Sequence, residues 1–378
     1  MKRRGMKKMR RLNKFYKLLA LTVLIPMLLS ACTNNGVETD YTLGSNENGN
    51  ETIDDNRYFF SDFELVPISD NEMGFLEEDM SGTLFGVRAL NSNWDEPFFG
   101  NITLDSTQDV LVAQVGHLAL GNEERTFLLK VFLNYEEVGF RPVGADSYKT
   151  ELLISVPAGF EAHIPFTLGF ELPEPDYTHA LTVAVFENTH LHFADFSQED
   201  AEELWMNGIG AMALNFDVTY GVGGQINLTA NYTEPLSRHE NMQFHNLQIN
   251  QNFDDFSTVS GSDGIHSSHI EVRRGEMVEL AWWANPYHSE DVFDRDSYVV
   301  VGLLDWQQVE MNGEPYLLVN TEDAYRMVDH GVFTFEAPNE VGMYEFIAFI
   351  VPNPTQALHE YTFFPLEFSW RFTIEVVE

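Results

Sequence analysis

Beyond residue 100 the chain alternates apolar and polar residues in short blocks separated by Gly, Pro and Asn. This period of two predicts β-strands with one buried face. Three blocks recur in the same order at offsets of 168, 171 and 165 residues: 102–113 with 270–281, 132–138 with 303–309, and 179–188 with 344–353. Three matches in register are hard to attribute to chance. The sequence therefore predicts two copies of one domain, over residues 82–225 and 240–378.

The matched blocks also agree in which residues they bury. In the middle block one face carries Phe127, Leu129, Val131, Leu133 and Tyr135, and the matching face carries Tyr298, Val300, Gly302, Leu304 and Trp306. We therefore expect Tyr135 and Trp306 inside the cores of their copies. Short strands and frequent turns over roughly 140 residues predict a β-sandwich for each copy, and hence an all-β chain. Capping patterns predict two short helices, over residues 197–208 and 321–330.

Two segments of the second copy follow a known order. Val332-Phe333-Thr334-Phe335-Glu336-Ala337-Pro338 and then Gly342-Met343-Tyr344-Glu345-Phe346 resemble the strand, corner and tyrosine strand of immunoglobulin-like or fibronectin-like domains. Trp306 stands where such domains place a core aromatic residue. The resemblance implies two tandem immunoglobulin-like sandwiches. It departs from the family in that neither copy contains a cysteine and that His179 takes the tyrosine's place in the first copy. A resemblance in fold implies no function.

The N-terminus carries a different pattern. Residues 1–17 hold nine Lys or Arg and no acid, and an apolar run over residues 18–29 follows. This is typical of a signal peptide, and the run is too short for a stable membrane span. It ends in Leu29-Ser30-Ala31-Cys32, which resembles the lipobox of bacterial lipoproteins. The resemblance implies removal of residues 1–31 and a diacylglycerol on Cys32. The chain would then sit, lipid-anchored, on the extracytoplasmic face of the bacterial cell membrane.

Two other interpretations of Cys32 remain. The apolar run could be an uncleaved helical anchor, or the thiol could stay free. A disulfide within the chain is excluded because Cys32 is the only cysteine.

The segment after Cys32 is poor in apolar residues. It consists mostly of Asn, Gly, Thr, Ser and acids, so residues 32–56 are predicted to form a lipidated cysteine and a flexible tether. A flexible coil of this length would hold the folded part on average ~25 to 30 Å from the lipid. Residues 57–81 form an N-terminal extension that is either a first strand or a cap, because residues 58–68 are aromatic and partly alternating.

Charge narrows the range of partners. Residues 1–31 contain nine of the 21 bases and none of the 59 acids, which leaves a mature chain with 12 bases and a net charge of −47. Such a chain is unsuited to nucleic acid, which requires a basic surface. It is equally unsuited to docking by charge on anionic lipids. The simplest interpretation is that the charge keeps an exported protein soluble.

No catalytic pattern stands out. The sequence has no nucleophile elbow, P-loop or zincin helix; His239-Glu240 is followed by His245, two residues too late for the zincin pattern. We therefore expect no enzymatic activity. An enzyme whose site is assembled from distant loops remains the alternative.

Two kinds of cluster suggest metal ions. His190 and His192 would share a strand face, with Asp195 close by, which suits a transition metal. Oxygen ligands for calcium crowd two loops: Asp291, Asp294 and Asp296 in one, and Asp254, Asp255 and Asp263 in the other. Neither loop matches a fixed calcium pattern, so solvated charge is expected there. Ordinary surface histidines are the alternative for the pair. Apart from the lipid on Cys32, no cofactor is expected.

The pair Trp282-Trp283 suggests a binding surface. Adjacent strand residues point to opposite faces, and Trp282 shares its face with Val278 and Leu280. Trp283 is then the ring expected on the surface, where it and Tyr287 could stack on a sugar or on a partner's side chain. Coverage of Trp283 by a loop or by the other copy is the alternative.

These expectations support two main hypotheses of function. The first is a non-enzymatic, lipid-anchored surface protein whose sandwiches bind or space a surface protein or a glycan. The second is a lipoprotein that binds a carbohydrate or a metal ion and works beside a transporter or a sensor. In both, the membrane is contacted through the lipid, and nucleic acid is excluded as a partner.

Overall fold

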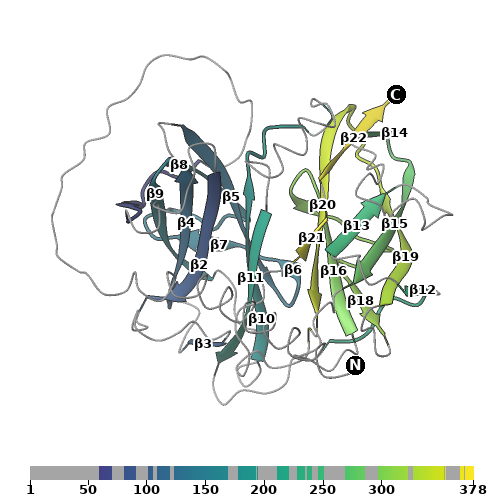
Figure 1. The fold of residues 1–378 in the computed structure, drawn as a ribbon, viewed down its shortest axis with the longest axis horizontal. Helices are drawn as coiled ribbons and strands as arrows, with labels where there is room; N and C mark the ends of the chain where they lie inside the picture. The colour runs from purple at the N-terminus through teal and green to yellow at the C-terminus, as the bar shows by residue number, and fades with distance from the viewer. Residues whose placement is uncertain are drawn as a thin grey trace, which may run out of the picture.

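The computed structural model is built from strands that form two side-by-side sandwiches (Figure 1). It describes residues 59–69, 81–90, 101–104, 109–119, 123–168, 178–192, 194, 211–220, 228–234, 236–240, 246–250, 269–285, 297–321, 327–352, 354, 367–369 and 371–378. Within these ranges every named element is a strand, and no helix is long and apolar enough to cross a membrane.

Eleven strands of the first sandwich lie among the described residues. They are β1 Glu64–Pro67, β2 Ser81–Ala89, β3 Asn101–Leu104, β4 Val110–Ala119, β5 Glu124–Leu133, β6 Glu136–Glu137, β7 Phe140–Pro142, β8 Glu151–Pro157, β9 Phe160–Leu168, β10 Thr178–Glu187 and β11 Ala211–Tyr220. One sheet has the order β1-β9-β4-β2, with β7 paired to β9. The other has the order β3-β11-β10-β5-β6, with β8 paired to β5. We call the second sheet the inner sheet, because it faces the other sandwich.

The second sandwich contains the remaining strands. They are β12 Ser237–Glu240, β13 Asn246–Asn250, β14 His269–Arg273, β15 Met277–Asn285, β16 Ser297–Leu304, β17 Gln307–Gln308, β18 Leu317–Asn320, β19 Met327–Glu336, β20 Gly342–Pro352, β21 Glu367–Phe368 and β22 Phe372–Val377. Its outer sheet has the order β12-β19-β15-β13. Its inner sheet has the order β14-β22-β20-β16-β17, with β18 paired to β16 and β21 to β20.

The two sandwiches share one topology. The outer orders β1-β9-β4-β2 and β12-β19-β15-β13 correspond, as do the inner orders β3-β11-β10-β5-β6 and β14-β22-β20-β16-β17. In each inner sheet the first strand pairs in parallel with the last, β3 with β11 and β14 with β22. The expectation of an all-β chain with two tandem immunoglobulin-like sandwiches is confirmed. The boundaries of the domains stay a prediction.

A strand lies in the N-terminal extension, whose nature the sequence left open. β1 pairs antiparallel with β9, and Phe60 just before it is 4% exposed within the first core. In the second sandwich β12 takes the same edge, paired with β19. This edge strand therefore belongs to the repeated unit.

The tyrosine that suggested the immunoglobulin fold makes the expected corner. Tyr344, near the start of β20, donates its hydroxyl hydrogen to the Glu340 carbonyl at 3.0 Å. Such a bond back to the preceding backbone is typical of this fold. At the matching place His179 is 4% exposed, and its Nδ1 lies 3.0 Å from Asn134 Nδ2. A different polar pair thus occupies the corner of the first copy.

The expectation that Tyr135 and Trp306 lie inside their own sandwiches is wrong. Both rings instead lie between the two inner sheets. Each is the second residue of a two-residue turn with positive φ, 50° and 70° at Asn134 and Tyr135, and 46° and 69° at Asp305 and Trp306. Such turns reverse the chain at once. The alternation of faces therefore ends before the aromatic residue is reached.

Three large cores hold the molecule together. One fills the first sandwich, one fills the second, and a third joins residues from both inner sheets. The third core includes Phe132 and Phe186 from the first copy and Trp306 and Phe349 from the second, all fully buried. The residue pattern also predicts independent β-sandwiches that are joined near residues 232–240, a polar stretch broken by Pro235. That expectation is wrong, because their facing sheets bury apolar side chains against each other.

The prediction of a helix over residues 321–330 is also wrong. Residues 327–330 of the expected helix 321–330 begin β19, which pairs with β15 from Met277↔Glu336 to Ala284↔Asp329. Pairing in the sheet outweighs a weak capping signal. The other expected helix, over residues 197–208, lies outside the described residues.

Gly331 in β19 gives a direct test of the packing in the second sandwich. A Cβ at this position would meet the Trp282 ring and the Tyr232 hydroxyl, each at 2.5 Å. We expect Gly331→Ala to lower the free energy of unfolding by ~1 to 3 kcal/mol through overpacking, measured by denaturant unfolding. Gly82→Ala is the control, since its nearest neighbour would be Leu118 at an ordinary 3.7 Å. Equal stability of the two variants would contradict the prediction.

Candidate functional site: the junction of the two sandwiches

Trp283, the expected surface ring, is buried. It does lie on the opposite face from Trp282, but it is only 1% exposed and stacks on His330 at 4.7 Å between ring centroids. It packs with Ala281 and Val328 on the outer sheet. The expectation of an exposed indole is therefore wrong, because the outward face of β15 is covered as well. Tyr287, its expected companion, lies outside the described residues.

The two described candidate metal ligands, His190 and His192, have different polar neighbours. His190 lies in a turn rather than a strand, with Nδ1 3.5 Å from Thr126 Oγ1. His192 Nδ1 lies 3.5 Å from Glu345 Oε1 of the second copy. Within the described ranges no three His, Cys, Asp or Glu side chains are placed to hold a metal ion. Asp195, both acidic loops and Cys32 lie outside those ranges, so lipidation stays a prediction.

The junction between the inner sheets is the largest feature that the residue patterns did not predict. Its centre is aromatic: Phe132 meets Phe349 edge to face at 5.4 Å, and Phe186 lies 5.2 Å from Trp306. Tyr135 packs edge to face on Tyr316 at 5.8 Å. Each of these pairs joins one copy to the other, so the aromatic rings bridge the junction.

Equivalent residues of the two copies pair reciprocally at one edge of this junction. The Glu137 amide donates to Gln308 Oε1 at 2.7 Å, and the Gln308 amide donates to Glu137 Oε2 at 3.2 Å. These residues are 171 positions apart, which is the offset of the repeat. Lys130, fully buried, forms an ion pair with Glu137 at 3.0 Å and another with Glu151 at 3.5 Å. The junction therefore has an approximate twofold character.

At the other edge an arginine of the second copy holds the end of β10. Arg371 Nη1 and Nη2 donate to the carbonyls of Glu187 and Leu191 at 3.2 and 2.5 Å. Its Nε pairs with Glu345 at 3.4 Å, and its guanidinium lies 4.7 Å from the Trp306 ring centroid. Arg371 and Glu345 are 2% and 1% exposed. We call these two residues the buried clamp.

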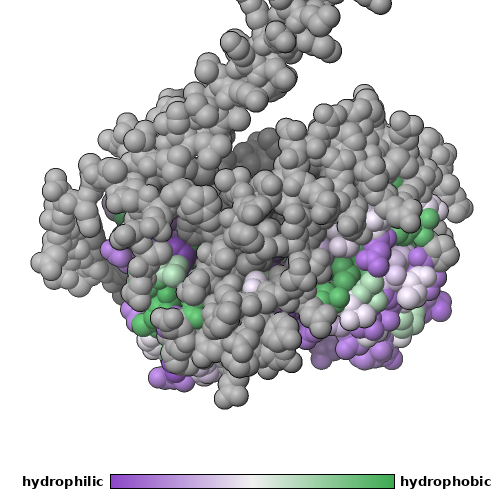
Figure 2. Space-filling view, turned by 90° about the horizontal axis from the view of Figure 1, so that it is seen from below, coloured by the Kyte–Doolittle hydropathy of each residue, from purple (hydrophilic) through white to green (hydrophobic). Residues whose placement is uncertain are grey.

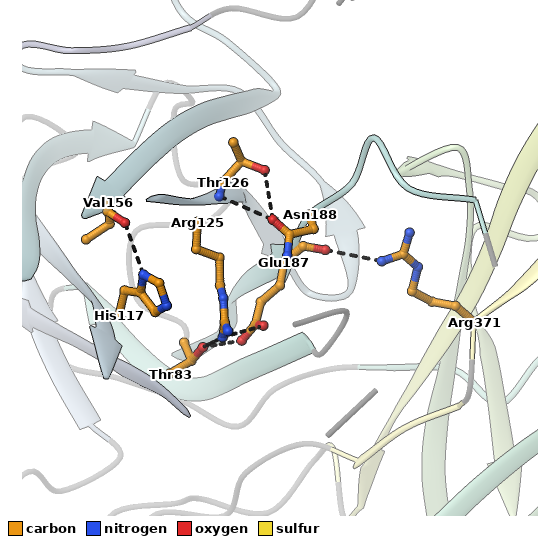
Figure 3. Close-up of polar contacts among 8 residues, drawn as sticks. All are labelled: Thr83, His117, Arg125, Thr126, Val156, Glu187, Asn188 and Arg371. Carbon is orange, nitrogen blue, oxygen red and sulfur yellow. Dashed lines mark hydrogen bonds and ion pairs between the residues drawn. The ribbon is translucent and has the colours of Figure 1, made fainter. Parts of the chain in front are cut away.

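The clamp leads into a polar cluster of the first copy (Figure 3). The Glu187 carboxylate accepts from Arg125 Nη1 at 3.0 Å and from the Thr83 hydroxyl. Asn188 Oδ1 accepts from the Thr126 amide at 3.4 Å. The cluster thus links β2, β5 and β10, and through the Glu187 carbonyl it reaches Arg371 across the junction.

His117 on β4 lies beside this cluster and is 2% exposed. Its Nδ1 faces the Val156 carbonyl at 3.3 Å. Burial, and secondarily the charge of Arg125, lowers the pKa of His117 from 6.5 to about 4. The imidazole is therefore neutral at physiological pH and contributes to packing rather than to charge.

The depressed pKa predicts a loss of stability in acid. The unfolded chain takes up a proton at His117 near pH 6.5, whereas the folded chain resists it until about pH 4. This contribution is complete above pH 6.5, declines between pH 6.5 and 4, and stays constant below. Thermal melts across this window should fall more for the wild type than for His117→Gln. Parallel melting curves would contradict the prediction. His269→Gln, at a side chain 39% exposed, is the control.

A second polar group ties the outer sheet of the first copy together. Glu161 accepts from Gln114 Nε2 at 2.5 Å and lies 2.8 Å from His163 Nε2. Burial lowers the pKa of Arg88 to about 10, with Glu161 and Glu64 acting against this. Arg88 stays protonated at neutral pH, so the group joins β1, β2, β4 and β9 by charge and hydrogen bonds.

One signal in the sequence could have revealed the junction. The segments 127–133 and 298–304 are almost continuously apolar, and such runs are typical of strands covered on both faces. Their alternate residues do divide between two cores: Leu129 and Val131 face the first sandwich, whereas Leu128 and Phe132 face the junction.

No protein-family model matches the chain, and neither does any curated protein. Among solved structures it is similar to red sea bream transglutaminase, with 10% identity over 78% of this chain and 31% of that one, at a TM-score of 0.19. It is similar to the C-terminal domain of the Streptococcus pyogenes antigen I/II-family protein AspA, with 9% identity over 79% and 100%, at 0.20. A Bacteroides thetaiotaomicron lipoprotein matches with 9% identity over 36% and 81%, at 0.20. The chain thus spans 31% of the transglutaminase.

Proposed function

We propose that this chain is a lipid-anchored, acidic surface protein outside the cytoplasm that binds or spaces another molecule without catalysis. The observation that carries the proposal is the third core, in which both copies bury apolar and aromatic side chains. Two sandwiches joined in this way move as one body, which suits a protein that holds a binding surface at a set place.

The surface of the described residues fits such a role. Where Figure 2 shows described residues, apolar residues lie next to polar ones. A mosaic of this kind suits a solvated protein with local contact points. A surface protein or a glycan would be the partner.

The alternative, a carbohydrate- or metal-binding lipoprotein beside a transporter or sensor, has less support. Its aromatic platform relied on Trp283, which is 1% exposed. Its ligands His190 and His192 contact different copies of the sandwich. We therefore prefer the surface-protein proposal.

The lipid anchor is tested by metabolic labelling with a palmitate analogue. We expect label on the wild-type chain and none on Cys32→Ala, and the variant should leave the membrane fraction. The physical reason is that each buried methylene of the lipid contributes ~0.8 kcal/mol, enough with two chains for stable anchoring. Surface proteolysis of whole cells is the companion measurement. Label retained on Cys32→Ala, or protection of the wild type from external protease, would contradict the proposal.

A further inference from the structure

Exposed apolar side chains gather where the described part of the chain begins. Phe59 is 55% exposed and bridges in parallel with Leu153 of β8. Val143 and Tyr148, in the connection between β7 and β8, are 45% and 43% exposed. These are three of the seven large hydrophobic side chains that are exposed among the described residues. Their grouping at one edge of the first sandwich distinguishes them from scattered surface residues.

Backbone and side-chain contacts place the two segments side by side. The Phe60 amide donates to the Leu153 carbonyl at 3.0 Å, which holds this segment along β8. A Cβ on Gly144 would lie 2.8 Å from the Asp62 carboxylate, so the connection between β7 and β8 lies against the same segment. We call Phe59, Val143 and Tyr148 the tether-root surface.

The charge around this surface is close to balanced in a chain that is strongly acidic. The Arg141 guanidinium lies 5.2 Å from the Tyr148 ring centroid, and Lys149 follows directly. Two of the 12 bases after residue 31 are therefore here, opposite the acids Asp62 and Asp146. Beyond about 8 Å, physiological salt screens most charge interactions. The local balance therefore matters more at a contact than the net charge of −47.

We propose that the tether-root surface docks on the membrane that carries the Cys32 lipid, with Phe59 and Tyr148 at the headgroup level. Aromatic rings with an apolar body and a polar partner are typical of that level. The inference rests on the proposed lipid anchor. Residues 33–56, the predicted tether, end three positions before Phe59. A short tether gives an effective concentration in the millimolar range, roughly, at which a weak contact is occupied.

Docking would fix the orientation of the molecule. The tether-root surface lies beside β8, at an edge of the inner sheet of the first sandwich, so docking would set this edge against the membrane.

The test uses the full lipidated chain in vesicles of phosphatidylcholine with a minor fraction of phosphatidylglycerol and nitroxide-labelled lipid. Because Cys32 is the only cysteine and its thiol would be acylated, Ser147→Cys supplies a single site for a fluorophore beside Tyr148. Asn339→Cys, exposed between β19 and β20, is the matched control. Flotation with the vesicles reports the anchor, and quenching reports docking.

We expect quenching at position 147 and none at position 339. Adding Phe59→Ala and Tyr148→Ala should reduce quenching at position 147 to the control level, with an unchanged melting temperature. Equal quenching at both positions in protein that floats would overturn docking while leaving the anchor intact. Protein that does not float would overturn the anchor, and docking through the tether with it.

Discussion

Replacing Trp306 with alanine is expected to lower the free energy of unfolding by ~3 to 5 kcal/mol, a large part of a typical total of ~5 to 15 kcal/mol. The ring is fully buried between the sheets, where it contacts Phe186 of the first copy and Arg371 of the second. Its removal would leave a cavity in the core that both copies share. Denaturant unfolding measures the loss, and limited proteolysis should show the sandwiches separating before either one unfolds.

The control for this substitution is Met277→Ala. Met277 is 59% exposed, so its truncation should change the free energy of unfolding by no more than ~0.5 kcal/mol. If Trp306→Ala were as stable as Met277→Ala, Trp306 would not be packed in the junction. If only the second sandwich lost stability, the ring would belong to that core alone.

Removing Arg371 from the buried clamp is expected to lower the free energy of unfolding by as much as Trp306→Ala does. Arg371→Met would remove the guanidinium that lies 3.4 Å from the Glu345 carboxylate, which is 1% exposed, at a cost of ~3 to 5 kcal/mol. It would also remove the two bonds to the carbonyls of Glu187 and Leu191. Denaturant unfolding gives the loss. Small-angle scattering should show a wider range of distances between the sandwiches than in the wild type.

Two further variants distinguish the effect of the buried charge on stability from the effect of lost packing. Glu345→Gln in the Arg371→Met background removes the buried negative charge, so part of the stability should return. Arg274→Met is the matched surface change: its ion pair with Glu378, at 3.2 Å, joins side chains that are 55% and 79% exposed. It should cost less than ~1 kcal/mol. A similar cost for Arg371→Met and Arg274→Met would show that the clamp does not hold the copies together.

Both predictions concern the same physical property, the stiffness of the junction. Apolar rings fill its centre, and polar groups close two of its edges, with Glu137 and Gln308 at one and Arg371 at the other. A surface protein that spaces or presents a partner benefits from such stiffness, because a fixed geometry lowers the entropy lost on binding.

The sequence by itself determined the repeat and the strands. Alternation with a period of two reports which residues a strand buries, and the recurrence of three blocks was enough to predict two sandwiches of one kind. Tyr344 and the segments around it correctly indicated the immunoglobulin-like corner, because that hydrogen bond joins residues four apart. Such local features can be predicted from the sequence because they depend on residues that are close together along the chain.

Only the tertiary structure decided where the second faces of the strands go. The alternation predicts Trp283 on the surface and Trp306 in the core of the second copy. In the structure Trp283 is buried on the outer sheet, and Trp306 lies in the junction between the inner sheets. A two-residue turn with positive φ moved Trp306 to the other face. Arg371 of the buried clamp donates to the carbonyl of Glu187, 184 residues away, so no local spacing could predict this contact. Packing between sheets depends on residues that are distant in the sequence. The alternation of apolar and polar residues shows that a strand face is buried but not which residues cover it.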